Sequence, residues 1–260
     1  MTHLLSVEAV TRQYRLPRQA LFQSPPVQVA VRDASFHLDR GETLGIVGES
    51  GSGKSTLARM VMAFERPDQG RILFQGQDIN TLSGADLRLA RQRFQMVFQD
   101  PFGSLDPRRR VGWSIAEPLR ATDRATAAQI ATRVDEALDH VGLRSRDGAK
   151  YPHEFSGGQR QRIAIARAII TRPALLVADE AVSALDVSVQ AQILNLLMDL
   201  QQELGLGILF ISHDLAVVAS ICDRILVMQS GTILETGLAS EVLSNPRHDY
   251  TRTLLTASGM

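Results

Sequence analysis

The chain has 260 residues, of which 44% are hydrophobic and 22% are charged. This length suits one large domain, or one domain with a subdomain, and allows a substantial buried core. Lys plus Arg and Asp plus Glu both number 28, which argues against a general nucleic-acid coat protein, because such proteins are basic overall. The single cysteine, Cys222, excludes an intrachain disulfide and a cysteine-built metal cluster and favours a reducing compartment. The first residues lack a signal-peptide pattern, and no apolar run approaches the ~20 residues of a membrane helix, so we expect any membrane role to go through a partner.

The N-terminal part of the sequence predicts strands. Apolar and polar residues alternate over 4–10, 27–38 and 70–79. Prolines in 15–26 predict a loop between the first two strands. A short apolar strand over 42–48 then ends in glycine, and the segment 55–64 is helical in character.

The middle of the chain is predicted to be helical, and the remainder to alternate strands and helices. In 125–143, Ile130, Val134, Leu138 and Val141 share one helix face, with Gly142 as the expected C-cap. Further along, the expected elements are a helix after the glycines at 157–158 that stops at Pro173, buried strands over 174–180 and 207–213, a helix over 189–205, a hairpin with a Ser-Gly turn over 225–237, and a loop with a short helix over 244–257. The sequence therefore predicts an α/β core with an antiparallel β addition at the start and a helical insertion in the middle.

Residues 48–56, GESGSGKST, fit the phosphate-binding pattern G-x-x-x-x-G-K-[ST] between a strand and a helix. The glycines let the backbone curl with its N–H groups pointing inward, and these groups and the helix N-terminus attract phosphate oxygens. Lys54 would reach the β- and γ-phosphates, and the Ser55 hydroxyl could bind Mg²⁺. A chance glycine-serine loop is the alternative, which the complete motif and its flanks disfavour. The expected nucleotide-binding residues here are Gly48, Glu49, Ser50, Gly51, Ser52, Gly53, Lys54, Ser55 and Thr56.

Two carboxylates follow the apolar strand in LLVADE. Asp179 ends the strand, where it could reach the Mg²⁺ shell, and Glu180 is placed to polarise a water in line with the γ-phosphate. A simple strand-end cap is the alternative interpretation. Kinases, GTPases, helicases and transport ATPases all share the phosphate loop, so that loop alone does not fix the chemistry.

Five segments narrow the choice, because GESGSGKST, FSGGQRQR, LLVADE, SALD and FISHDL occur in this order. Together they resemble an ATP-binding cassette ATPase, the ATP-hydrolysing subunit of ABC transporters, over essentially the whole chain. The resemblance implies ATP and Mg²⁺ as cofactors and a P-loop NTPase fold, with a RecA-like parallel-sheet core, an N-terminal antiparallel β subdomain and an inserted α-helical subdomain. It assigns 1–98 and 173–235 to the nucleotide-binding core with its β subdomain, 99–172 to the Q-loop and helical signature subdomain, and 236–260 to a C-terminal extension.

The resemblance gives FSGGQRQR a role as the signature motif, which contacts ATP held by a second subunit. Ser156, Gly157, Gly158 and Gln159 open a helix, and the first N–H groups of a helix form an anion site. Phe155 stands where leucine is commonest in the family, a conservative change. A merely capped helix start is the alternative.

The resemblance also implies roles for individual residues outside these two motifs. Gln99 resembles the Q-loop glutamine that contacts Mg²⁺ and the attacking water, and His213 resembles the switch histidine that steadies the γ-phosphate. Asp186 resembles the D-loop aspartate that couples the two sites of a dimer. Tyr14 is a candidate to stack on adenine, although an aromatic near a strand end is as often core packing. The implied catalytic residues are Glu180, His213 and Gln99, and the implied Mg²⁺ ligands are Ser55, Gln99 and Asp179.

Two further segments, QDPFGSLDPRRRVG and NPRHDYTRTLLTA, resemble ATPases of dipeptide, oligopeptide and nickel importers, especially the second, "F"-type ATPase of dipeptide importers. This resemblance implies a peripheral subunit on the cytoplasmic face of the bacterial inner membrane, energising import of peptides or, alternatively, nickel. The implied partners are two permease subunits, a second and paralogous ATPase subunit and, indirectly, an extracytoplasmic solute-binding protein, with no nucleic acid. The arginine run in DPRRR is either a solvated face or a partner contact. Two other classes remain open: an ABC ATPase that acts outside transport, and a nucleotide-dependent scaffold.

Overall fold

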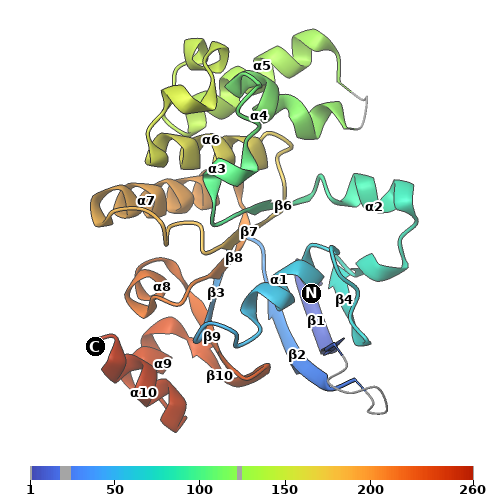
Figure 1. Cartoon of the computed structure of the whole chain (residues 1–260), viewed down its shortest axis with the longest axis vertical. Coiled ribbons are helices and arrows are strands. Elements are labelled where there is room, and N and C mark those ends of the chain that lie inside the picture. The colour runs from blue at the N-terminus through green and yellow to red at the C-terminus, as the bar shows by residue number, and fades with distance from the viewer. Residues whose placement is uncertain (1, 18–24, 122–124, 260) are drawn as a thin grey trace. The chain divides into compact units, whose positions relative to one another are not determined.

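The computed structural model (Figure 1) describes residues 2–17, 25–121 and 125–259, so the predicted loop at 15–26 lies mostly outside the described residues. The described chain forms two compact units. The first contains residues up to Leu82 and from Leu209 onward, and the second spans Ser83–Ile208. The predicted helical subdomain, 99–172, falls inside the second unit.

An antiparallel sheet forms the start of the first unit, in the order β2-β1-β4-β5. Its strands are β1 (Leu5–Arg15), β2 (Val27–Leu38), β4 (Gln69–Phe74) and β5 (Gln77–Asp78). The single strand predicted over 70–79 is wrong, because Gln75 and Gly76 take positive φ values of 52° and 83° and turn the chain back on itself. A short 3₁₀ segment, Ile79–Thr81, follows this hairpin.

The first unit also contains the strands β10-β9-β3-β8 in that order. They are β3 (Thr43–Val47), β8 (Gly207–Ile211, of which 209–211 belong to this unit), β9 (Arg224–Gln229) and β10 (Thr232–Leu238), and β3 runs parallel to β9. Every residue of β3 and β8 is buried, as expected for strands covered on both faces. Ser230 and Gly231, with φ of 48° and 83°, form the predicted hairpin turn between β9 and β10.

The helices of the first unit are α1 (Lys54–Val61), α8 (Leu215–Ile221), α9 (Ala239–Ser244) and α10 (Asp249–Ala257). The last two follow β10 and end the chain, in red in Figure 1. Helix α9 packs against α8, β9 and β10. The helix predicted over 55–64 ends earlier than expected, since Ala63 has a φ of 52°.

The second unit contains two parallel strands, β6 (Phe94–Val97) and β7 (Leu175–Asp179). Its helices are α2 (Gly84–Ala90), α3 (Pro101–Ser104), α4 (Val111–Arg120), α5 (Ala127–His140), α6 (Gly157–Ile169) and α7 (Val187–Leu204), with 3₁₀ segments at Ser145–Ala149 and Pro152–Glu154. Helices α4, α5 and α6 pack against one another and form a helical cluster (Figure 1), and α6 also packs against β6.

Residues with a left-handed backbone follow the ends of three helices of this unit, and one of them, Gly142, was predicted from the sequence. Val134 and Leu138 are buried on one face of α5, Val141 is buried directly after it, and Gly142, with a φ of 71°, then turns the chain. Gly205 caps α7 at a φ of 62°. Helix α6 ends at Ile169, short of the predicted stop at Pro173, because Arg172 already has a φ of 52°. In the part of the chain that the structure describes, no helix is long and apolar enough to cross a membrane.

Candidate functional site

The loop between β3 and α1 has a backbone that only glycine allows at two points. Gly48 and Gly53 have φ of 152° and 105°. A Cβ on Gly48 would lie 2.1 Å from the Met228 carbonyl oxygen, and one on Gly53 would lie 2.3 Å from that of Ala30. Helix α1 begins directly after Gly53, and its first N–H groups have no partner within the helix. The loop and the helix start therefore present backbone donors suited to phosphate.

Lys54 is buried inside this loop, with 5% of its surface exposed. Its Nζ donates to the carbonyl oxygens of Gly48, at 2.7 Å, and of Glu49, at 2.8 Å. A buried ammonium group needs such acceptors, because its desolvation is costly. The Ser52 hydroxyl, also buried, has no hydrogen-bond partner among the described residues. A phosphate oxygen would satisfy that hydroxyl, so the loop fits a phosphate group chemically.

Residues from elsewhere in the first unit hold this loop through hydrogen bonds. The Gly231 N–H donates to the Ser52 carbonyl at 2.9 Å, and the Gly231 carbonyl accepts from the Arg32 N–H at 2.8 Å. On the other side, the Glu49 N–H donates to the phenol oxygen of Tyr250, in α10, at 3.2 Å. The sequence pattern did not predict Gly231 or Tyr250 as part of the site, because neither lies in a phosphate-binding motif.

His213 follows β8 and is exposed. Its neighbour Ser212 fixes the turn: the Ser212 N–H donates to the Ile46 carbonyl of β3 at 3.2 Å, and its hydroxyl accepts from the Asp214 N–H at 3.0 Å. Ile46 lies next to the last residue of β3, and the glycine-rich loop follows β3 directly, so Ser212 and this loop lie at the same end of β3.

Tyr14 lies near the end of β1 and is held by its own unit. Its hydroxyl donates to Glu65 at 2.6 Å, and the Arg12 guanidinium lies over its ring at 4.9 Å. One face of the ring thus already carries a cation. Stacking of adenine on Tyr14 stays a prediction.

In the second unit, the carboxylate pair ends β7. Asp179 is the last strand residue, and Glu180 has a φ of 48°, a left-handed conformation that costs a side-chain-bearing residue energy. Ser183 supports this turn, because its hydroxyl donates to the Glu180 carbonyl at 3.0 Å. The same hydroxyl accepts from Gln99 Nε2 at 3.2 Å. Ser183 therefore connects Gln99 to the Glu180 turn, a link that no spacing rule in the sequence reveals.

The segment FSGGQRQR forms a capped helix start. The Ser156 hydroxyl accepts from the Gln159 N–H at 3.4 Å, while the Gln159 side chain accepts from the Ser156 N–H at 3.0 Å. This is a capping box. It engages the N–H of Gln159 and leaves the N–H groups of Gly157 and Gly158 in the first turn of α6, where no intrahelical acceptor exists. A cap and an anion site are thus compatible here.

Asp186 also caps a helix, at the start of α7. Its carboxylate accepts from the Val189 N–H at 3.0 Å and from the Ser188 hydroxyl at 2.8 Å. These two hydrogen bonds, the backbone one first, hold the pKa of Asp186 below its ordinary value. The carboxylate consequently stays charged and keeps the start of α7 in place.

A family model described as "ABC transporter" matches residues 31–183, more than half of the chain. The chain belongs to the ABC transporter family. The matched residues of this ABC protein include the glycine-rich loop, Gln99, the Ser156 segment and the two carboxylates, whereas Tyr14, Asp186 and His213 lie outside the match.

Curated relatives of this ABC protein carry import names. It is 51% identical to the glutathione import ATP-binding protein GsiA of Salmonella typhimurium, over 98% of this chain and 41% of that protein. The chain thus spans less than half the length of that relative. It is also 48% identical to a putative peptide import ATP-binding protein of Brucella abortus, over 98% of this chain and 78% of the relative.

Solved structures confirm that the ABC protein has the expected α/β fold. The ATP-binding cassette MJ0796, in a dimeric post-hydrolysis state bound to ADP and Pi, matches with a TM-score of 0.78 at 27% identity, covering 90% of this chain and 98% of that one. The protein cbiO1 from Clostridium perfringens, part of an ABC transporter complex, matches with a TM-score of 0.81 at 29% identity, covering 94% of this chain and 92% of that one.

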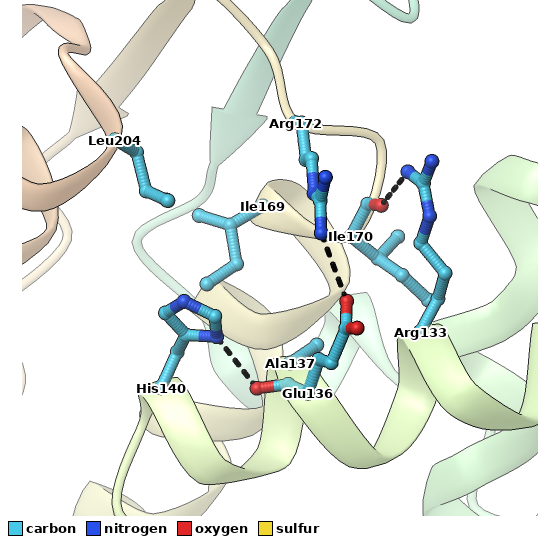
Figure 2. A pocket seen from close by; sticks show the side chains of 8 residues that line it. All are labelled: Arg133, Glu136, Ala137, His140, Ile169, Ile170, Arg172 and Leu204. Carbon is cyan, nitrogen blue, oxygen red and sulfur yellow. Dashed lines mark hydrogen bonds and ion pairs between the residues drawn. The ribbon is translucent and has the colours of Figure 1, made fainter.

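A small hollow in the second unit lies apart from these motifs (Figure 2). The polar groups around it pair among themselves: Arg172 with Glu136 at 3.1 Å, and Arg133 with the Ile170 carbonyl at 3.3 Å. The remaining lining residues are Ala137, His140, Ile169 and Leu204. These pairings tie α5 to the end of α6, and none of the residues predicted for the ABC site lines the hollow.

Proposed function

We propose that this chain is the ATP-hydrolysing subunit of a bacterial binding-protein-dependent importer, with di- or oligopeptides as the solute. The observation that carries the proposal is the loop at 48–56, in which Lys54 is buried against two carbonyls and the buried Ser52 hydroxyl lacks a partner among the described residues. Membership of the ABC family and relatives named for peptide and glutathione import support the solute class. Nickel import by the same architecture is the alternative.

ATP would be held by residues 48–56 through backbone N–H groups and the Lys54 ammonium. Of the residues proposed for Mg²⁺, Ser55 offers a hydroxyl, Asp179 a carboxylate and Gln99 an amide oxygen, and hard oxygen donors are what this ion prefers. Because Gln99 Nε2 donates to Ser183, its amide oxygen is the atom suited to a cation. When bound, Mg²⁺ would neutralise charge on the phosphates.

The chain's own residues account for each chemical task. Glu180 would polarise the attacking water as a general base, and His213 would steady the γ-phosphate. The Ser156 segment would contact the γ-phosphate of ATP held by a second ATPase subunit, with Asp186 coupling the two sites. Differential contact with that phosphate would close and reopen the pair, which is a two-state switch.

The same proposal places the chain on the cytoplasmic face of the inner membrane, under two permease subunits, with a second and paralogous ATPase chain and an outside binding protein. The arginine run supports a partner contact. Arg109 lies over the Trp113 ring at 4.6 Å, and Arg110 lies over Tyr151, an exposed aromatic, at 5.9 Å. Aromatic residues and Arg are both enriched at the cores of protein interfaces.

The proposal is tested by Glu180→Gln, which keeps the shape of the side chain and removes the carboxylate that would act as the general base. We expect the purified variant to bind ATP like the wild type, while phosphate release, measured with permeases in vesicles, falls about 10²- to 10⁴-fold. Lys54→Ala is the companion variant and should lose ATP binding itself. Wild-type hydrolysis in the Glu180→Gln protein would remove the role given to Glu180, and uptake of labelled peptide against labelled nickel would decide the solute.

A further inference from the structure

The phenol of Tyr250 reaches the phosphate loop from the far end of the chain. Tyr250 lies in the first turn of α10 and is buried, with 9% of its surface exposed. Its oxygen accepts the Glu49 N–H at 3.2 Å. We propose that Tyr250 is a positioning residue for ATP binding, acting on Lys54 through the peptide unit that joins Gly48 to Glu49. The inference rests on the proposed role of this loop.

That peptide unit is held at both ends. Its N–H, from Glu49, donates to Tyr250, and its carbonyl, from Gly48, accepts from Lys54 Nζ at 2.7 Å. Two hydrogen bonds on opposite sides of an amide fix the orientation of its plane, and each strengthens the other by polarisation. Gly48, with a φ of 152°, has more rotational freedom than any other residue type would have. The Tyr250 hydrogen bond offsets that freedom and presents the carbonyl to Lys54.

The start of α10 is itself held by hydrogen bonds, so the backbone position of Tyr250 is fixed. Glu235, a buried carboxylate of β10, accepts from the Arg247 N–H at 2.8 Å, from the His248 N–H at 3.1 Å and from the Thr251 hydroxyl at 2.6 Å. Burial alone would raise the pKa of Glu235, but these three donors hold it below its ordinary value. The charged carboxylate thereby locks the helix start that carries Tyr250.

The hydroxyl, rather than the ring, carries the proposed role. A phenylalanine would fill the same space, and burying a hydroxyl without a partner costs free energy. The pKa of Tyr250 is raised, mainly by burial. The hydrogen bond from the Glu49 N–H lowers this pKa, and the charge of Glu49 raises it further. The phenol therefore remains neutral at physiological pH and acts as a hydrogen-bonding group toward the loop.

The test uses Tyr250→Phe in the full chain, with Thr253→Val as the matched control, because Thr253 lies on the same helix and its hydroxyl donates to the Asp249 carbonyl within that helix at 3.0 Å. Without nucleotide, amide hydrogen exchange of Glu49 should accelerate roughly tenfold in Tyr250→Phe, while the Leu57 amide of α1 is unchanged. The Kd for ATP, measured calorimetrically, should rise roughly three- to tenfold. Thr253→Val should change neither quantity.

Lys54→Ala, measured in the same series, separates this inference from the function on which it rests. If Lys54→Ala binds ATP as tightly as the wild type, the proposed role of the loop fails. If Lys54→Ala loses binding while Tyr250→Phe keeps the wild-type Kd, only the role of Tyr250 is overturned, whether or not the Glu49 amide exchanges faster. A weaker Kd with unchanged Glu49 exchange would also overturn it, because the effect would then not pass through this peptide unit.

Discussion

Two glycine-rich loops of this chain each lead into a helix, one at GESGSGKST in the first unit and one at FSGGQRQR in the second. In the first, Gly48 and Gly53 take positive φ, and an added Cβ would strike backbone carbonyls. In the second, Gly157 and Gly158 lie in the first turn of α6. An added Cβ on Gly158 would lie 2.3 Å from a Val189 methyl carbon, and one on Gly157 would meet only ordinary contact.

The same residue type thus serves different physical needs in the two loops. The loop at 48–56 needs glycine for a backbone path that wraps inward, and other elements of its unit brace it through Gly231 and Tyr250. The loop at 155–158 holds itself through the Ser156–Gln159 capping box and needs glycine at 158 for close packing against α7. A loop that encloses a ligand and one that offers a helix end to a neighbour would differ in this way.

The largest expected effect comes from Gly48→Ala. Its Cβ would meet the Met228 carbonyl at 2.1 Å, and backbone cannot yield as a flexible side chain does. We expect the free energy of unfolding to fall by about 2–5 kcal/mol, from combined conformational strain and overpacking. Gly51→Ala is the matched control, since its φ of 80° is also positive but an added Cβ has open space around it. Denaturant titration should give only about 1–2 kcal/mol for Gly51→Ala; equal losses would contradict the steric argument.

Gly158→Ala should have a smaller effect, because the obstacle is a side chain. We expect a loss of about 1–3 kcal/mol in the free energy of unfolding. Val189→Ala removes the obstructing methyl, so the double variant should recover most of the loss attributable to Gly158. Gly157→Ala is the control and should leave stability within about 1 kcal/mol of the wild type. If the double variant shows no recovery in denaturant titration, the contact with Val189 does not explain the glycine.

The sequence predicted many of the strands and helices and the motif loops, because their causes are local. The buried strand β3, the hairpin turn at Ser230–Gly231 and the caps at Gly142 and Gly205 all follow from hydrophobic pattern and glycine conformation. Strand β6 and helix α2 were not predicted, helices α1 and α6 end earlier than expected, and the strand expected over 70–79 is two strands joined by a turn. Gln75 adopts a left-handed φ there without being a glycine, so the turn has a weak sequence signal.

The missed site residues have long-range causes. Tyr250 is 201 positions from Glu49, and Ser183 is 84 positions from Gln99. No motif spacing contains such pairs, since tertiary contacts alone bring them together. The roles of Gln99, Glu180, His213, Asp186 and Tyr14 in catalysis or binding stay predictions for the same reason: the described contacts show how each side chain is held, and function depends on what it meets when ATP is bound.

Glu235→Gln tests the anchoring of α10, the helix whose Tyr250 contacts the first loop. Because hydrogen bonds lower the pKa of Glu235 below its ordinary value of 4.5, its stabilising contribution is complete above that pH and is lost as the pH falls through the lowered pKa. We expect the variant to be less stable by about 1–2 kcal/mol at pH 7. Thermal unfolding across pH should show this difference shrinking below about pH 4.5. A difference that is constant across the range would contradict the charged anchor.

The smallest expected effect is that of Ser156→Ala, and it separates cap from anion site within the second loop. Loss of the capping hydroxyl should lower the free energy of unfolding by about 1 kcal/mol.

Asp at this position would still cap α6, yet its negative charge would repel a phosphate. Ser156→Asp should therefore keep wild-type stability and ATP binding by the isolated chain but prevent ATP-dependent dimer formation, followed by size-exclusion chromatography in the Glu180→Gln background. Ser156→Ala should still form the dimer there, because the Gly157 and Gly158 N–H groups are retained. If both variants dimerise equally well, the second loop is a helix cap and no more.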